Sequence, residues 1–341
     1  MSFASSSGGS FLESLRNFSF PNSAAAANKL TPSSQPFVGA TSEVIRTISG
    51  IEHRRLGNSN IAVSAVGLGT QRWGSTDFNA PDVDECHAML DYATEHGVNL
   101  VDTAEQYPIP SADRGVQSEG YTEKIIGQWI KADPARREKL VIATKVTGSS
   151  NINAKNIVKD VEGSLKRLET DYIDVYLAHW PARYTPQSNW GQSLAYNVDA
   201  EAAPWYRNAM PFEEFAEAMS KLIDQGKIRG YGECNSNAYG LGALAGAARC
   251  AGVPPPIAFQ GDFSILNRRS EENGLAEACS PVNENCGFMA YNVLAGGMLT
   301  GKYRTTPAAY DLYLEGSEGA AGKLFRTPRG RMDTTGWGPT L

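Results

Sequence analysis

The chain has 341 residues, of which 41% are hydrophobic and 20% are charged, and its formal net charge is −6. This size and composition allow a sizeable hydrophobic core in one large domain or two. The acidity and the scattered basic residues argue against a nucleic-acid-binding surface, and no apolar run approaches the roughly 20 residues of a membrane-spanning helix. The five cysteines form no Cys-x-x-Cys pair, which indicates free thiols rather than a disulfide framework or a zinc site.

The first 50 residues are predicted to be disordered. They are rich in serine and alanine, and Glu13 and Glu43 are their only acids. This composition is typical of organelle transit peptides, and it describes an untargeted disordered tail equally well. We therefore expect a plastid location, with the cytoplasm as the alternative, and a folded domain over residues 51–341.

From residue 51 onward, strand-like and helix-like segments alternate. Seven short β-branched or apolar runs predict strands, at residues 65–68, 98–101, 140–144, 172–178, 228–232, 257–260 and 288–292. Between them lie segments such as 157–168, whose apolar residues are spaced three or four apart, as in an amphipathic helix. The alternation indicates a parallel sheet with helical crossovers. One long connection, 183–211, is expected to be either functional or disordered.

A doubly wound sheet and a (β/α)8 TIM barrel both fit this α/β pattern. No G-x-G-x-x-G follows the first predicted strand, which weakens the dinucleotide-binding doubly wound alternative. In a barrel, functional residues lie at the C-terminal ends of the strands, and isolated polar residues stand at those positions here. The sequence therefore favours the barrel. Because only seven strands are recognised before the Gly/Pro/Arg-rich stretch 326–341, the barrel is predicted to be truncated before its eighth strand.

Four polar residues follow successive predicted strands: Asp102 and Tyr107 the second, Lys145 the third and His179 the fourth. Tyr107 is a candidate general acid if the cation of Lys145 helps it to share its proton. Asp102 would hold the lysine through a charge-assisted hydrogen bond, and His179 would orient a carbonyl oxygen. Each residue alone has an ordinary structural explanation in a turn, a loop or solvent. Their ordered occurrence at strand ends favours a proton-transfer site.

The segment 296–302 matches the phosphate-loop pattern G-x-x-x-x-G-K. Tyr303 stands where a small hydroxyl would hold Mg²⁺, so a nucleoside triphosphatase is rejected. A glycine-rich loop that leads to Lys302 can still hold the phosphates of a dinucleotide through backbone N–H groups.

Further polar residues follow the fifth and sixth predicted strands. Asn235, beside Cys234, and Gln260 carry amides that could grip a flat carboxamide, with Phe263 stacking on its ring; capping or turn roles are the alternatives. Glu123 is expected to be a charge on the surface or at a helix N-terminus. The aromatic residues suggest an apolar or ring-bearing substrate, although core packing explains them equally well. They are Trp73, Trp180, Trp190 and Trp205.

Together these segments resemble the aldo-keto reductase family over residues 54–331. The motifs that carry the resemblance are Leu68-Gly69-Thr70, 101–107, Thr144-Lys145, His179-Trp180-Pro181, 226–229 and 299–303. Two segments point more narrowly to its Tas-like branch, Tyr107-Pro108-Ile109-Pro110 and Ile265-Leu266-Asn267-Arg268.

The resemblance implies a barrel that binds NADP(H) across its C-terminal mouth and reduces a small-molecule aldehyde or ketone by hydride transfer. The family's catalytic tetrad corresponds to Asp102, Tyr107, Lys145 and His179. Its cofactor-binding positions correspond to Gly69, Thr70, Asp102, Cys234, Asn235, Gln260, Phe263, Tyr291, Asn292, Leu294, Ala295, Gly296 and Lys302. No metal, nucleic-acid or membrane partner is implied, and the oligomeric state stays open.

Two departures from the family pattern are visible. Cys234 replaces the usual serine, which is expected to weaken a hydrogen bond to the nicotinamide and to make the site sensitive to thiol oxidation. The segment that holds the adenosine 2′-phosphate has no counterpart, which leaves the choice between NADPH and NADH open. A non-catalytic, cofactor-sensing subunit and an inactive truncated fragment are therefore the alternatives to a working reductase.

Overall fold

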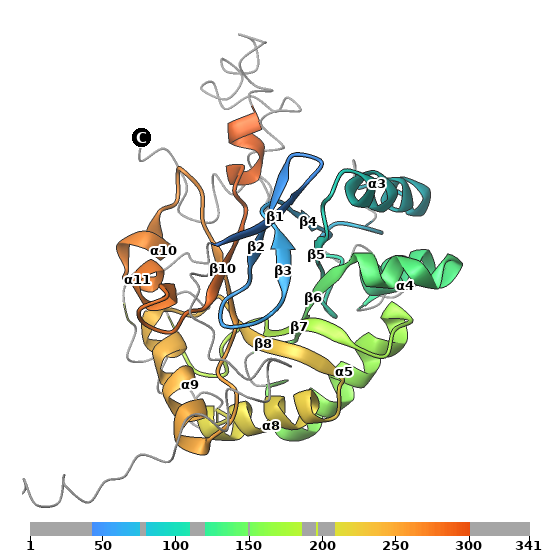
Figure 1. Cartoon of the computed structure of the whole chain (residues 1–341). Coiled ribbons are helices and arrows are strands. Elements are labelled where there is room, and N and C mark those ends of the chain that lie inside the picture. Colours follow the sequence, from blue (N-terminus) through green and yellow to red (C-terminus); the bar gives the residue numbers. More distant parts are fainter. Residues whose placement is uncertain are drawn as a thin grey trace, which may run out of the picture.

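The computed structural model describes residues 43–75, 80–109, 120–148, 151–185, 196 and 209–300. Seven parallel strands in sequence order curve into a barrel, with the long helices outside it (Figure 1). These strands are β4 (Gly67–Gly69), β5 (Leu100–Asp102), β6 (Val141–Val146), β7 (Ile173–Ala178), β8 (Ile228–Cys234), β9 (Ala258–Asp262) and β10 (Gly287–Tyr291). The prediction of an α/β barrel with seven recognisable strands is confirmed.

Each strand of the barrel pairs with its neighbour in the chain, so that β4 and β10 are the two edges of the sheet. No backbone pairing joins these two strands within the described ranges. Residues 301–341, on which the predicted truncation depends, lie outside the described residues. So do residues 1–42, and the transit-peptide prediction therefore stays a prediction.

The outer layer consists of helices that bury one face on the sheet. In α5, Ile157, Val161, Leu165 and Leu168 are buried at spacings of three and four, and Asn153 caps the first turn by accepting a hydrogen bond from the Asn156 amide. The described helices are α3 (Val83–Glu95), α4 (Tyr121–Ala132), η1 (Pro134–Lys139), α5 (Ala154–Leu168), α8 (Phe212–Asp224), α9 (Ala238–Ala251), α10 (Arg269–Glu272), α11 (Leu275–Cys279) and η4 (Ala295–Thr300). None of these helices has the length and apolar character that crossing a membrane would require.

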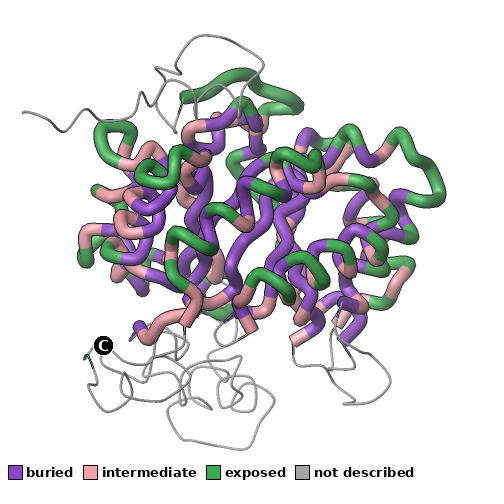
Figure 2. The backbone as a smooth tube through the Cα atoms, turned by 90° about the horizontal axis from the view of Figure 1, so that it is seen from below, coloured by how far each residue is buried: buried purple, intermediate pink, exposed green. Residues whose placement is uncertain are grey.

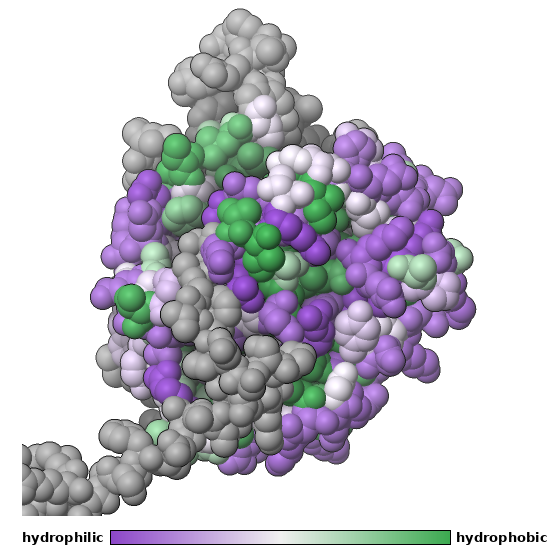
Figure 3. Space-filling model, viewed as in Figure 1, coloured by the Kyte–Doolittle hydropathy of each residue, from purple (hydrophilic) through white to green (hydrophobic). Residues whose placement is uncertain are grey.

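A small antiparallel sheet precedes the barrel, and the sequence prediction missed it. Its strands are β1 (Val44–Ile48), β2 (Ile51–Arg55) and β3 (Ala62–Ser64). Ser49 and Gly50 both have positive φ, as a two-residue hairpin turn requires, so Ile48 pairs with Ile51. The expectation that the first 50 residues are disordered is therefore wrong for residues 43–50. Exposed apolar residues of β1 contribute to the hydrophobic area over this sheet in Figure 3.

The inner core fills the barrel and is closed at the N-terminal ends of its strands by a plug formed by residues 56–63. Leu56 and Ile61 of the plug are buried with inward-facing residues of the barrel strands. A Cβ at Gly57 would stand 2.1 Å from the carbonyl oxygen of Ile257, so this approach needs glycine. In Figure 2 the buried residues lie in the middle of the molecule, and the exposed turns of the helices lie around them. With this end plugged, the opposite mouth is left for a site.

Candidate active site

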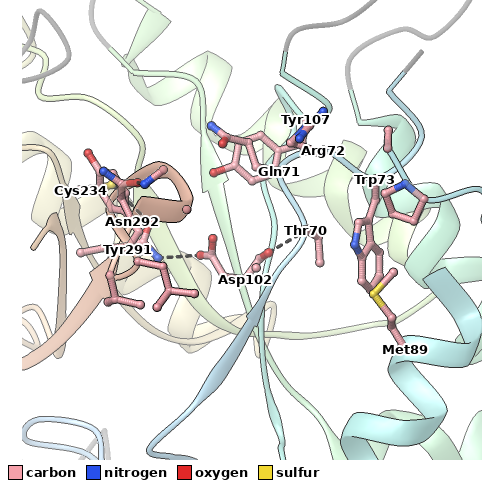
Figure 4. A pocket seen from close by; sticks show the side chains of 18 of the residues that line it. Thr70, Gln71, Arg72, Trp73, Met89, Asp102, Tyr107, Cys234, Tyr291 and Asn292 are labelled. Carbon is pink, nitrogen blue, oxygen red and sulfur yellow. Dashed lines mark hydrogen bonds between the residues drawn. The ribbon is translucent and has the colours of Figure 1, made fainter. Parts of the chain in front are cut away.

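The C-terminal ends of the strands surround a cavity of about 1160 Å³. Asp102 stands on its wall between Thr70, Trp73 and Met89 on one side and Cys234, Tyr291 and Asn292 on the other (Figure 4). The other predicted site residues that line it are Gly69, Tyr107, His179, Asn235, Gln260, Leu294 and Gly296. Strand ends far apart in the sequence thus meet at one mouth, as parallel barrel topology dictates.

Asp102 and Lys145 form an ion pair on neighbouring strands. The Lys145 Nζ donates to Asp102 Oδ1 at 2.7 Å and to the Thr103 carbonyl oxygen at 2.7 Å, and its side chain is fully buried. Burial acts to lower the pKa of Lys145, but the Asp102 carboxylate and its hydrogen bond raise that pKa above the usual value. Lys145 is therefore an ammonium ion at neutral pH.

Tyr107 lies on the loop after β5 and places its hydroxyl beside this cation. Its Oη is 3.5 Å from Lys145 Nζ, which also lies 4.9 Å from the centre of the phenol ring. Burial raises the pKa of Tyr107 above its usual value, and the charge of Lys145 acts in the opposite direction. Tyr107 is thus protonated at neutral pH, with a cation placed to stabilise the phenolate that remains after proton transfer.

His179 lies at the end of β7, with its ring inclined at 76° to the Tyr107 ring and a centroid distance of 5.6 Å. Burial and the charge of Lys145 hold the pKa of His179 well below its usual range, so the imidazole is neutral. Its buried Nδ1 has no hydrogen-bond partner among the described residues. The residue itself lines the cavity, so its ring stands beside any ligand that enters there.

Two amide residues, Asn235 directly after β8 and Gln260 within β9, form a connected network with the tetrad. Gln260 donates to Asp102 Oδ1 at 2.7 Å, and Asn235 donates to the His179 carbonyl oxygen at 2.9 Å. The Tyr291 hydroxyl donates to Asn235 Oδ1 at 2.6 Å. The predicted carboxamide-binding side chains therefore do come together, with their orientation set by the residues beside them.

Cys234 lies within this network, and its thiol donates to Gln260 Oε1 at 3.4 Å. Burial raises the pKa of Cys234 to about 12, so it stays a thiol at neutral pH. Because peroxide reacts with the thiolate, this environment argues against the expected sensitivity to oxidation.

Other predicted cofactor residues lie beside the cavity or away from it. The hydroxyl of Thr70 donates to the Asp102 carbonyl oxygen at 2.8 Å, and Asn292 Oδ1 accepts from the Gly296 amide at 2.9 Å. Phe263 and Ala295 do not line the cavity; the Phe263 ring packs edge-to-face on Phe288 with centroids 6.0 Å apart. Tyr291, at the end of β10, does line the cavity. Lys302, like Trp190 and Trp205, lies outside the described residues.

Glu123 corrects one expectation. It is completely buried in α4, where Oε1 accepts from the Thr144 hydroxyl at 2.6 Å and Oε2 from Arg167 Nε at 2.6 Å. The expected position at a helix N-terminus is confirmed, because Glu123 lies in the first turn of α4, but the alternative of a surface charge is wrong. The sequence could not show this, because the partner that neutralises it lies on the following helix, α5.

Several cavity residues were missed by the sequence analysis. Gln71 and Arg72 follow β4 and line the cavity next to the expected Trp73, and Met89 reaches it from α3. For Gln71 and Arg72, the signal available in the sequence was their position directly after the predicted Gly69-Thr70 pair. Trp180, which was expected on weaker grounds, also lines the cavity.

A parallel barrel that gathers a buried ion pair, a protonated phenol and a neutral imidazole around one cavity has the features of an enzyme that transfers protons to a small molecule. The sequence pattern of the Aldo/keto reductase family matches residues 65–315, and the chain belongs to this family of oxidoreductases.

Two bacterial relatives and one solved structure place the chain within the family. Protein tas of Escherichia coli (strain K12) is 37% identical over 264 residues, which are 74% of this chain and 71% of that protein. Aldo-keto reductase YhdN of Bacillus subtilis (strain 168) is 29% identical over 259 residues, 74% of this chain and 65% of that protein. The thermostable aldo-keto reductase Tm1743, solved with the inhibitor epalrestat, superposes with a TM-score of 0.53 at 29% identity, covering 77% of this chain and 80% of that one. The predicted family and its Tas-like branch are confirmed.

Proposed function

We propose that the protein is an NADP(H)-dependent oxidoreductase that reduces aldehydes or ketones to alcohols, with Tyr107 as the general acid. The observation that carries the proposal is the 3.5 Å approach of the Tyr107 hydroxyl to a buried Lys145 that Asp102 holds in its charged form. Membership of the Aldo/keto reductase family supports the oxidoreductase class.

The residues around the cavity fit a nicotinamide cofactor. Asn235 and Gln260 offer amides for a carboxamide, and Tyr291 offers a ring at the same wall. Cys234 offers Gln260 Oε1 only a weak thiol donor, at 3.4 Å, so a ligand amide can compete for this oxygen. When bound, the reduced nicotinamide supplies a hydride to the carbonyl carbon.

The chain's own groups handle the proton. The substrate oxygen accepts a hydrogen bond from Tyr107 and is oriented by the neutral His179, which lines the same cavity. As negative charge develops on that oxygen, Tyr107 transfers its proton to it. The ammonium of Lys145 stabilises the phenolate that remains, and Asp102 fixes the ammonium in place. The hydride on carbon and the proton on oxygen together complete the alcohol.

The test is Tyr107→Phe, which keeps the ring and removes the proton. In the full-length protein we expect turnover of an aldehyde panel, followed by NADPH absorbance, to fall by about 10³-fold. The Kd for NADPH, from fluorescence quenching, should stay within about twofold. Tyr92→Phe, at a tyrosine that is 65% exposed on α3, is the matched control and should retain full activity.

A Tyr107→Phe protein that keeps normal turnover would assign the acid to another group. A wild-type protein that binds NADPH but reduces no member of the panel would favour a non-catalytic, cofactor-sensing role instead.

A further inference from the structure

Glu105 lies between two members of the tetrad in the chain, three residues after Asp102 and two before Tyr107, and no role has so far been given to it. The residue is only 8% exposed. Its carboxylate accepts a hydrogen bond from the backbone N–H of Thr147, and its own backbone N–H donates to the Lys145 carbonyl oxygen at 3.4 Å. The loop that carries Tyr107 is therefore joined to the end of β6 at Lys145 itself and again two residues later, at Thr147.

The groups that face Glu105 offer it no cation. Glu123 of α4 and Asp160 of α5, the charged groups that act on Glu105, are both acids, and Arg167 pairs with Glu123. Tyr176 of β7 also faces Glu105, and its buried hydroxyl has no hydrogen-bond partner among the described residues. Glu105 is thus a buried acid that is held by backbone and forms no ion pair within the described part of the chain.

Such a carboxylate lowers stability at neutral pH. Burial raises the pKa of Glu105 to about 7; the hydrogen bonds from Thr147 oppose the rise, and the acids at Asp160 and Glu123 add to it. Because the folded-state pKa lies above that of the unfolded chain, the stability that protonation contributes is fully present in acid and is lost as pH rises through about 7. A glutamine would keep the shape without this cost, so an acid here indicates a functional need for the charge.

We propose that Glu105 is a positioning residue whose carboxylate, by holding the Thr147 N–H, fixes the Tyr107 hydroxyl against Lys145 for proton transfer. The inference rests on the reductase function proposed above. The carboxylate acts through the two loops rather than on substrate, so its removal changes kcat and leaves cofactor binding intact. The charged form makes the stronger hydrogen bond, and activity therefore rises with pH as Glu105 ionises.

The kinetic experiment compares full-length wild type, Glu105→Gln and Glu105→Ala on one aldehyde with NADPH, across pH values on both sides of neutrality. For Glu105→Ala we expect kcat to fall by about 10- to 100-fold, as for a displaced catalytic group, with the NADPH Kd unchanged. Glu105→Gln should retain part of kcat and lose the wild-type rise near pH 7. Glu95→Gln, at an exposed position on α3, is the control. Wild-type kcat and pH profile in Glu105→Ala would overturn the proposal.

Stability separates a positioning role from a merely structural one. Above pH 7, Glu105→Gln should unfold at a higher temperature than wild type, and the difference should vanish at pH values below about 4.5. A variant that is more stable and less active than wild type is the expected signature. A variant that is less stable at every pH would make Glu105 an ordinary structural residue.

Amide hydrogen exchange at Thr147 tests the hydrogen bond between its N–H and the Glu105 carboxylate directly, without an activity assay. In Glu105→Ala this amide should exchange at least about tenfold faster than in wild type, and unchanged exchange would refute the contact whatever the kinetics. If wild type reduces no carbonyl, the reductase function fails on its own, while the exchange result still decides whether Glu105 joins the two loops.

Discussion

The two ends of the barrel treat a buried acid in opposite ways. Near the N-terminal end of β7, Asp174 is completely buried, and both of its oxygens are occupied. Arg137 donates to Oδ2 at 2.7 Å and Arg229 to Oδ1 at 2.6 Å, and the Ile142 amide adds a bond to Oδ2 at 2.9 Å. Arg137 is itself held by three further hydrogen bonds and lies 3.7 Å from the centre of the Tyr172 ring.

At the C-terminal end, Asp102 is partly exposed to solvent, and some buried polar atoms near it have no hydrogen-bond partner among the described residues. The Asp102 side chain is 20% exposed, and its hydrogen bonds from Lys145 and Gln260 both fall on Oδ1. Buried polar atoms of Thr103 and His179 have no partner among the described residues. A complete hydrogen-bond network stabilises a fold, whereas a buried polar group without a partner costs stability. The N-terminal end of the barrel therefore contributes mainly to stability, whereas the C-terminal end carries the candidate active site.

The variant with the largest expected effect on stability is Arg137→Met, which leaves the buried Asp174 carboxylate paired with Arg229 alone. We expect the free energy of unfolding to fall by about 3–5 kcal/mol, and the melting temperature by about 10 °C. The kcat of the folded protein should stay within about twofold. Lys131→Met removes an exposed ion pair and should change the free energy of unfolding by less than about 1 kcal/mol. Equal melting temperatures for the two variants would contradict the stabilising role of this end.

Lys145→Met makes the matching change at the working end. Because Asp102 reaches the cavity and keeps its bond from Gln260, we expect the free energy of unfolding to fall by only about 1–2 kcal/mol. Turnover should fall by about 10²-fold or more, since nothing then stabilises the phenolate of Tyr107. Chemical denaturation and steady-state kinetics on one preparation measure both quantities. A stability loss as large as that of Arg137→Met would show that the two ends do not differ.

The smallest expected effect is that of Thr103→Val. The hydroxyl of Thr103 is buried without a partner among the described residues, so replacing it by a methyl group removes an unsatisfied group at nearly constant volume. We expect the free energy of unfolding to stay level or to rise by up to about 1 kcal/mol. If the free energy of unfolding instead fell by more than about 1 kcal/mol, the hydroxyl would have a structural partner, and the two ends of the barrel would differ less than described above.

Much of the barrel could be predicted from sequence, because its strands are buried on both faces and form short continuous apolar runs. The tetrad followed from the same pattern, since the four residues interrupt it at strand ends. Strands β1–β3 were missed because they are short and carry His53, Arg54 and Arg55, which break any apolar alternation. Their order comes from pairing and from the plug, neither of which a local pattern can show.

Contacts across the fold set the limit for the site. Glu123 and Glu105 are both acids in loop-to-helix regions of the sequence, and only the positions of Arg167 and Thr147 distinguish a paired carboxylate from an unpaired one. Phe263 had the right residue type for a ring-stacking role, but it packs on Phe288, and Tyr291 lines the cavity instead. Residue type and order predicted which chemistry is present, and packing decided which side chain carries it.

The plug at the N-terminal end also sets an order of events during synthesis. Leu56 and Ile61 pack with Ile257 and Met289, so they meet these partners only after about 200 further residues have been added, which takes on the order of 10–40 s of translation. Until then Leu56 and Ile61 lack the part of their cover that Ile257 and Met289 supply, and apolar surface exposed on a growing chain is a target for chaperones and for aggregation. The plug is thus synthesised early, but its packing against the barrel is completed late.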